Sequence, residues 1–168
     1  LNDKEKEEVR SLKEYLRIKA REKADKVFGK YVFMRGLIEF TNYCKNDCIY
    51  CGIRNSNKNA ERYRLSKEDI LSCCEIGYEI GFRTFVLQGG EDTYYNINIM
   101  SDIVGAIKTK FPNSALTLSI GEKEEEYYKT LKEKGADRFL LRHETADDIH
   151  YSKLHPKNMS LENRKECL

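Results

Sequence analysis

The chain has 168 residues, about the length of a single domain. Hydrophobic residues make up 40% of it and charged residues 35%, with two prolines and ten glycines, which excludes collagen-like, low-complexity and disordered classes. The 30 basic and 28 acidic side chains leave a net charge of +2, so nothing in the balance argues for a nucleic-acid partner. No stretch approaches the 18 apolar residues of a membrane span.

Six cysteines occur in a chain whose first residues are hydrophilic and carry no signal-peptide pattern. In such a chain clustered cysteines bind metal or do redox chemistry more often than they form disulfides, so we expect a cytoplasmic protein. The chain starts with Leu1 and stops at Leu168 inside a predicted helix, without a glycine or proline stop signal. These missing signals predict that it is a fragment of a longer protein.

The first 27 residues predict one charged helix, which Gly29 ends. Acidic and basic residues interleave along it, so we interpret it as a solvated helix over one end of the main domain. Residues 1–30 are therefore expected to form an N-terminal helical extension, and residues 31–168 a core domain that is truncated at its C-terminal side. The apolar residues that recur every three or four positions in the helix are Val9, Leu12, Leu16 and Ala20.

From residue 31 onward, short apolar runs alternate with helical patterns. This order predicts an α/β fold with a parallel sheet of the (β/α) TIM-barrel type, of which four main strands are about half. Between the second and third runs lies a loop rich in Asn and Asp, from residue 42 to about 64. The expected strands are 31–34, 37–41, 84–87, 115–119 and 138–142, and the expected helices are 66–80, 99–111, 124–134, 146–154 in part, and one from about 160.

Each strand from residue 37 onward runs into a polar or glycine-rich segment. The carboxyl ends of parallel strands hold the site in α/β folds, so these segments are expected to converge. The first strand leads into the cysteine loop, and the other three lead into Gln88–Asp92, Ser119–Glu122 and Arg142–Thr145.

Cys44, Cys48 and Cys51 form a C-x-x-x-C-x-x-C pattern in that first loop. Three thiolates in eight residues can ligate three corners of a 4Fe–4S cluster and leave the fourth iron open to a substrate or cofactor. Two alternatives stay open. A helix could bury the three cysteines on one face, although Asn46 and Asp47 favour a loop. A zinc site would require a fourth ligand, usually from a second cysteine pair.

The other three cysteines fall in predicted helices. We expect Cys73, Cys74 and Cys167 to be packed in the core rather than to bind metal.

These segments resemble the radical S-adenosylmethionine (SAM) superfamily. The cysteine motif with the aromatic Tyr50 before its third cysteine is specific for the superfamily. Further segments resemble its biotin synthase-like subgroup, and within it the HydE family of FeFe-hydrogenase maturation proteins. The resemblance covers about residues 20–168, and the segments that carry it are 38–44, 50–54, 88–92, 117–122, 140–146 and 160–164.

The resemblance implies two cofactors, a 4Fe–4S cluster ligated by Cys44, Cys48 and Cys51, and SAM. In the family, SAM chelates the open iron, and one electron cleaves its sulfonium carbon–sulfur bond to give a 5′-deoxyadenosyl radical that attacks the substrate. The implied partners are a small-molecule substrate, an electron donor such as a ferredoxin or flavodoxin, and other hydrogenase maturation proteins. Neither nucleic acid nor a membrane is expected.

The resemblance also implies that residues 88–91 bind the ammonium group of SAM. Gly89 and Gly90 remove side chains at a strand end, so that backbone carbonyls can approach a ligand closely. Gln88 and Glu91 belong to the same implied cofactor site. An ordinary turn between strand and helix is an equal alternative.

Beyond the fourth strand, Glu144 matches the family's ribose-binding residue. Arg142 and Arg164 match its arginines near the methionine end of SAM, where a guanidinium suits a carboxylate. The alternative is a surface Arg–Glu pair.

The remaining polar residues have weaker assignments. Ser119 and Glu122 are expected at the mouth of the barrel near substrate, with a solvated loop as the alternative. We interpret His143, His150 and His155 as structural or surface residues, and the catalytic residue is unknown.

Two kinds of function remain from the sequence. One is a radical SAM enzyme in the assembly of the FeFe-hydrogenase active-site cofactor, with biotin synthase-like sulfur insertion and methylornithine synthase-like rearrangement as competing chemistries. The other is a non-catalytic iron–sulfur binding module. The fragment alone is expected to be inactive.

Overall fold

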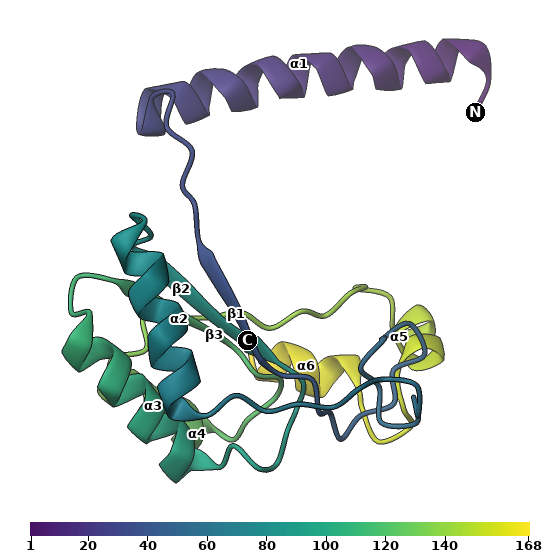
Figure 1. Cartoon of the computed structure of the whole chain (residues 1–168). Coiled ribbons are helices and arrows are strands. Elements are labelled where there is room, and N and C mark those ends of the chain that lie inside the picture. The colour runs from purple at the N-terminus through teal and green to yellow at the C-terminus, as the bar shows by residue number, and fades with distance from the viewer. The chain divides into compact units, whose positions relative to one another are not determined.

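A computed structural model describes residues 1–168, which form two compact units, Leu1–Phe33 and Met34–Leu168. The first unit consists of the helix α1 (Asp3–Phe28) and the residues after it (Figure 1). Asn2 and Glu5 form a reciprocal capping box at its start, and Gly29 ends it with a φ of 63°. No residue of α1 is buried. None of the helices in the structure has the length and apolar character that a membrane span requires.

The predicted strand at residues 31–34 is wrong. These residues form no regular structure, and their side chains are exposed. A strand needs a hydrogen-bonding neighbour, and this segment pairs with none, so its apolar run alone does not make it one. The first strand begins instead at Gly36.

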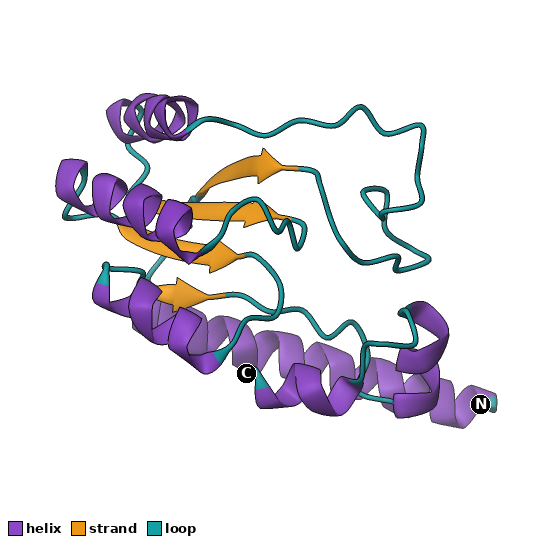
Figure 2. Ribbon diagram, turned by 90° about the horizontal axis from the view of Figure 1, so that it is seen from below, coloured by secondary structure: helices purple, strands orange, loops and turns teal.

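The second unit is built on one parallel sheet of four strands, as the sequence predicted. The strands are β1 (Gly36–Thr41), β2 (Thr84–Gly89), β3 (Ala115–Ser119) and β4 (Arg138–Phe139), and they lie side by side in chain order (Figure 2). Each neighbouring pair is parallel. The last strand is shorter than predicted, because the chain makes one more backbone bond, from Leu140 N to Leu118 O, and then leaves the sheet.

Three helices connect the strands and pack next to one another: α2 (Lys67–Glu79), α3 (Ile97–Lys110) and α4 (Glu125–Glu133) (Figure 1). The capping box of Ser66 and Asp69 predicted for α2 is confirmed. Helix α3 begins two residues earlier than predicted, because the Asn96 side chain accepts from the first free backbone N–H groups.

The hydrophobic core lies between the sheet and these helices. Phe85, Leu87, Leu116 and Leu118 alternate along β2 and β3 toward it, and Ile103 of α3 is buried in the same cluster. Because all four strands are parallel, their carboxyl ends lie at one edge of the sheet.

Of the two adjacent cysteines of α2, only one belongs to this core. Cys74 is buried as predicted, whereas the prediction for Cys73 is wrong because it is exposed. Adjacent helical residues point about 100° apart, so both cannot face the sheet. Two short helices, α5 (Asp148–Leu154) and α6 (Leu161–Glu166), close the chain, and Cys167, just after α6, is half-buried.

Candidate cofactor site

A cavity of about 370 Å³ lies at the carboxyl ends of β1, β2 and β3. Residues from the loop after β1, the ends of β2 and β3, the segment after β4 and the helix α6 share its wall. The structure therefore brings together residues that lie up to 125 positions apart, from 39 to 164. All the residues predicted to bind the cluster or SAM line it, namely Cys44, Cys48, Cys51, Gln88, Gly89, Gly90, Glu91, Arg142, Glu144 and Arg164.

The three cysteines of the motif lie in a loop and not on a helix, which removes the alternative of a buried helical face. All three are free and half-buried. A turn that is closed by the bond from Cys51 N to Cys48 O brings the second and third cysteines together, and Cys44 Sγ accepts from Asn46 N at 3.4 Å.

The cysteine geometry fits a cluster better than a single ion. No three His, Cys, Asp or Glu side chains converge as ligands of one metal ion, so the zinc alternative has no site. In a 4Fe–4S cluster each thiolate binds a different iron, and the sulfurs do not have to meet at one point. Burial raises the pKa of the Cys44 and Cys48 thiols, so their thiolates need a positive group such as iron in the cavity.

One arginine closes the cysteine loop. The guanidinium of Arg62 donates to the carbonyl oxygens of Asn42 and Ile53 through Nη1, and to those of Arg54 and Asn57 through Nη2. Asn42 precedes the first cysteine, and Ile53 and Arg54 follow the third. A single planar group therefore ties both ends of the cysteine segment together, a task for which its rigid fork of donors is suited.

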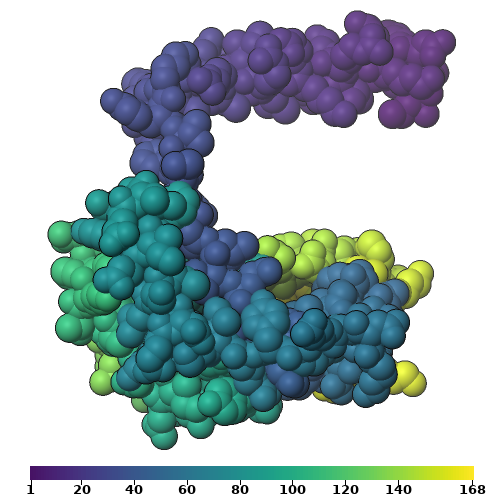
Figure 3. Space-filling view, in the orientation of Figure 1, coloured from purple at the N-terminus to yellow at the C-terminus, as the bar shows by residue number.

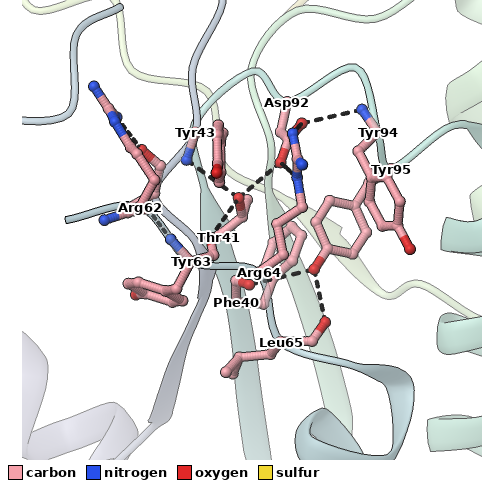
Figure 4. A network of polar contacts seen from close by, with 11 residues as sticks. Phe40, Thr41, Tyr43, Arg62, Tyr63, Arg64, Leu65, Asp92, Tyr94 and Tyr95 are labelled. Atoms are coloured by element: carbon pink, nitrogen blue, oxygen red, sulfur yellow. Dashed lines mark hydrogen bonds and ion pairs between the residues drawn. The ribbon is translucent and has the colours of Figure 1, made fainter. Parts of the chain in front are cut away.

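A second arginine attaches the same loop to β2 (Figure 4). Arg64 binds both carboxylate oxygens of Asp92, at 2.7 and 2.9 Å, and Thr41 Oγ1 donates to the same carboxylate at 2.7 Å. The Arg64 guanidinium also lies over the ring of Tyr43, 3.9 Å from its centroid, and near that of Tyr94. Burial alone would raise the pKa of Asp92, but the hydrogen bonds from Arg64 and Thr41 outweigh it and hold the pKa below its ordinary value.

Two glycines, the last residue of β2 and the residue after it, make room for the cysteine loop. A side chain at Gly90 would collide with the Tyr43 carbonyl oxygen and with Cys44, and one at Gly89 would lie 2.6 Å from the Thr41 methyl group. From the sequence, these glycines are predicted to allow the close approach of a ligand. The structure shows a different reason for glycine at these two positions, which is the close approach of the cysteine loop.

Glu91 is a buried carboxylate in a charged network. Its oxygens lie 3.3 Å from Lys45 Nζ and 3.8 Å from Arg164 Nη2, and it accepts from Glu122 N at 3.1 Å. Arg164 is also buried, and its Nε lies 2.8 Å from a carboxylate oxygen of Glu122. Glu122, which was expected to line the cavity mouth, thus holds Arg164 in place, whereas Ser119 does line the cavity.

The network around Glu91 is sensitive to any side chain added at Gly121. Its φ is 76°, and an added Cβ would collide with the Glu91 side chain. We expect Gly121→Ala to lower the free energy of unfolding by about 2 kcal/mol or more in urea denaturation. The matched control is Gly105→Ala in α3, where an added Cβ meets nothing within 4 Å and is expected to stabilise by about 0.5–1 kcal/mol. Equal effects of the two substitutions would contradict the assignment.

The segment after β4 forms the wall opposite the cysteines. Arg142 Nη2 lies 3.3 Å from Gln88 Oε1. No ion pair joins Arg142 to Glu144, so these two residues do not form the surface Arg–Glu pair that was the alternative to a cofactor site. Glu144 is exposed and is the only non-glycine residue with a positive φ, 62°. Residue types other than Gly, Asn and Asp seldom adopt this conformation, and here it occurs in the lining of the cavity.

Of the three histidines, two are on the surface and one is buried. His143 and His150 are exposed, whereas His155 is buried and bonded to Tyr50 of the cysteine loop. Neither this contact nor the roles of Arg62 and Arg64 were predicted from the sequence. The density of Arg and Asn between residues 54 and 64 was the signal available, because a long polar loop needs donors to satisfy its own carbonyl groups.

A parallel sheet with a C-x-x-x-C-x-x-C loop after its first strand is the arrangement of a radical SAM domain. The model of the Radical SAM superfamily matches residues 38–168, and the chain belongs to this superfamily. It is 48% identical over 149 residues to the [FeFe] hydrogenase maturase subunit HydE of Thermotoga maritima, which covers 86% of this chain and 42% of that protein.

Two further relatives carry the same fold. A 3-methylornithine synthase of Methanosarcina acetivorans is 34% identical over 137 residues, which are 80% of this chain and 39% of that protein. The crystal structure of a methylornithine synthase superimposes with a TM-score of 0.79 at 32% identity, over 85% of this chain and 42% of that one. The chain thus spans about two fifths of the relatives it matches, and the TM-score confirms the predicted barrel-type sheet.

Proposed function

We propose that the protein to which this chain belongs is a radical SAM enzyme that acts in the assembly of the FeFe-hydrogenase active-site cofactor. The observation that carries the proposal is the single cavity, which has three free cysteines on one wall and the residues matched to SAM contacts on the others. The 48% identity to HydE supports the hydrogenase role over the other chemistries of the superfamily.

Each wall of the cavity has a part in this proposal. Cys44, Cys48 and Cys51 hold the cluster. Glu144 accepts hydrogen bonds from the ribose of SAM, and Arg142 and Arg164 face its methionine end. When bound, the cluster and SAM supply one-electron cleavage of the sulfonium carbon–sulfur bond, which yields methionine and a 5′-deoxyadenosyl radical.

Within residues 88–91, only some acceptors are free to bind the ammonium group of SAM. The Glu91 carbonyl oxygen already accepts from Lys45 N, and its carboxylate is engaged with Lys45 and Arg164. The backbone carbonyl oxygens of Gln88 and Gly89 are thus the acceptors we assign to the SAM ammonium, since the side-chain amide oxygen of Gln88 accepts from Arg142. Gly90 and Glu91 then serve mainly to seat the cysteine loop beside them.

The partners follow from the same chemistry. A ferredoxin or flavodoxin supplies the electron, the radical attacks a small-molecule substrate, and the product passes to other hydrogenase maturation proteins. Six free cysteines fit a reducing cytoplasm.

Two other functions can be compared with this one. Methylornithine synthase-like rearrangement is supported by the fold match, but at 34% rather than 48% sequence identity. A non-catalytic iron–sulfur module needs the cysteines alone, and it gives no reason for a carboxylate with a positive φ and a buried arginine on the facing walls.

Anaerobic reconstitution with iron and sulfide, followed by SAM and a reductant, tests the proposal. We expect a brown protein that binds about four irons and releases 5′-deoxyadenosine. A protein that binds the cluster but neither responds spectroscopically to SAM nor cleaves it would be an iron–sulfur module. Activity with the precursor of 3-methylornithine would instead favour the rearrangement.

Glu144→Gln separates a ribose ligand from a surface carboxylate. Gln keeps the size and one acceptor but loses the charge, and a hydrogen bond to a charged group is worth about 1.5–3 kcal/mol. We therefore expect the variant to bind SAM roughly tenfold to a hundredfold more weakly, measured by titration of the cluster-loaded protein. Glu133→Gln at the exposed end of α4 is the matched control and should bind SAM as the parent does. Unchanged affinity in Glu144→Gln would remove this residue from the site.

A further inference from the structure

The end of α5 is in direct contact with the cysteine loop. The backbone N–H of Ile49 donates to the carbonyl oxygen of Leu154 at 3.0 Å, and the hydroxyl of Tyr50 lies 2.9 Å from Nε2 of His155. Both contacts join residues more than 100 positions apart. In Figures 1 and 3 the blue cysteine loop and the yellow-green C-terminal segment accordingly lie side by side.

The hydrogen bonds of His155 fix its tautomer. Its Nδ1 lies 2.9 Å from the carbonyl oxygen of Tyr151, and a carbonyl only accepts, so Nδ1 carries the proton. In the neutral ring Nε2 is then an acceptor, and the Tyr50 hydroxyl donates to it.

The imidazole is held firmly enough to position its partner. His155 is buried, and its ring stacks on that of Tyr151 with 3.8 Å between centroids and 17° between planes. The hydroxyl of Tyr151 in turn lies 3.3 Å from Nε of the buried Arg164. A continuous set of contacts therefore runs from the residue before the third cysteine to the arginine on the other wall of the cavity.

We propose that His155 is a positioning residue that fixes Tyr50, and with it the cysteine segment, against the wall that carries Arg164. This proposal rests on the proposed function only in that the segment it positions is the cluster ligand. Tyr50 lines the cavity and is half-exposed, and besides His155 only the Cys48 side chain is a hydrogen-bonding neighbour of its hydroxyl. Without His155 the Tyr50 hydroxyl would keep only its contact with Cys48 and lose its link to the C-terminal segment.

The first experiment uses the cluster-free whole protein, so it does not depend on the enzyme being active. We expect His155→Phe, which keeps the stacking but loses both hydrogen bonds, to speed hydrogen exchange of the peptide covering residues 45–51 severalfold. His155→Gln, whose side chain places an acceptor near the position of Nε2, should restore most of the protection. His150→Phe, on the exposed side of α5, is the matched control and should leave exchange unchanged.

The second experiment is a double-mutant cycle on the reconstituted protein. We expect Tyr50→Phe and His155→Phe each to raise the rate at which a chelator removes iron, by about threefold to tenfold, and the double variant to be no faster than either single one. Unchanged exchange, no rescue by His155→Gln, or additive effects in the cycle would overturn the proposal. Failure of the parent protein to take up iron would count against the proposed function, while the exchange experiment would still test His155.

Discussion

Replacing Cys44, Cys48 or Cys51 with Ala is expected to abolish the 4Fe–4S cluster. Each thiolate is the only proposed protein ligand of one iron, so a single substitution leaves two irons open instead of one. After anaerobic reconstitution the parent should bind about four irons and show the charge-transfer absorbance of the cluster, and each variant should lose nearly all of both. Loss of the cluster also removes 5′-deoxyadenosine production.

Cys73→Ala is the matched control for these three variants. Cys73 is exposed on α2, outside the cysteine motif, and its replacement by Ala is the same chemical change as in the three motif variants. It should leave iron content and absorbance at the parent level. A full iron load in all three motif variants, or a loss in Cys73→Ala, would contradict the assignment of the ligands.

Replacing Arg62 with Lys is expected to lower the free energy of unfolding by about 2–4 kcal/mol. The change keeps the charge but replaces a planar fork, which binds the carbonyl oxygens of Asn42, Ile53, Arg54 and Asn57, with a single ammonium that cannot reach all four. The unbonded carbonyls must then find water, and the two ends of the cysteine segment separate. Urea denaturation of the cluster-free protein measures the effect.

The matched control is Arg35→Lys, since Arg35 is exposed and makes no hydrogen bond or ion pair in the structure. It should change the unfolding free energy by less than about 0.5 kcal/mol. If Arg62→Lys is as mild as this control, its four hydrogen bonds do not hold the loop. A second consequence of Arg62→Lys is a lower yield of cluster, because the three cysteines are no longer held near one another.

The local features of the fold were predictable because they depend on neighbours in the sequence. Ser66 and Asp69 start α2, Gly29 ends α1, and the apolar runs at 84–87 and 115–119 lie in strands. The run at residues 31–34 has the same composition and forms no strand, because pairing with another strand decides the outcome and composition does not contain that information.

The candidate site was predictable to the extent that motifs mark it. The cysteines and the strand-end segments all reach the cavity, since the carboxyl ends of parallel strands share one edge. What spacing cannot reveal is which residues hold the ligating ones in place. The contacts of Arg64 with Asp92 and of Tyr50 with His155 span 28 and 105 positions, and they become visible only once the chain has folded.

The left-handed backbone at Glu144 means that the residue best for folding stability differs from the residue proposed to bind SAM. A residue other than glycine pays roughly 1 kcal/mol or more for a φ of 62°, so Glu144→Gly would relieve the strain and make the chain more stable. The same change removes the carboxylate from the cavity wall. Under the proposed function, stability therefore favours glycine at this position and SAM binding favours glutamate. In a laboratory evolution for heat resistance, residue 144 is the position where gain in melting temperature and loss of cofactor should appear together.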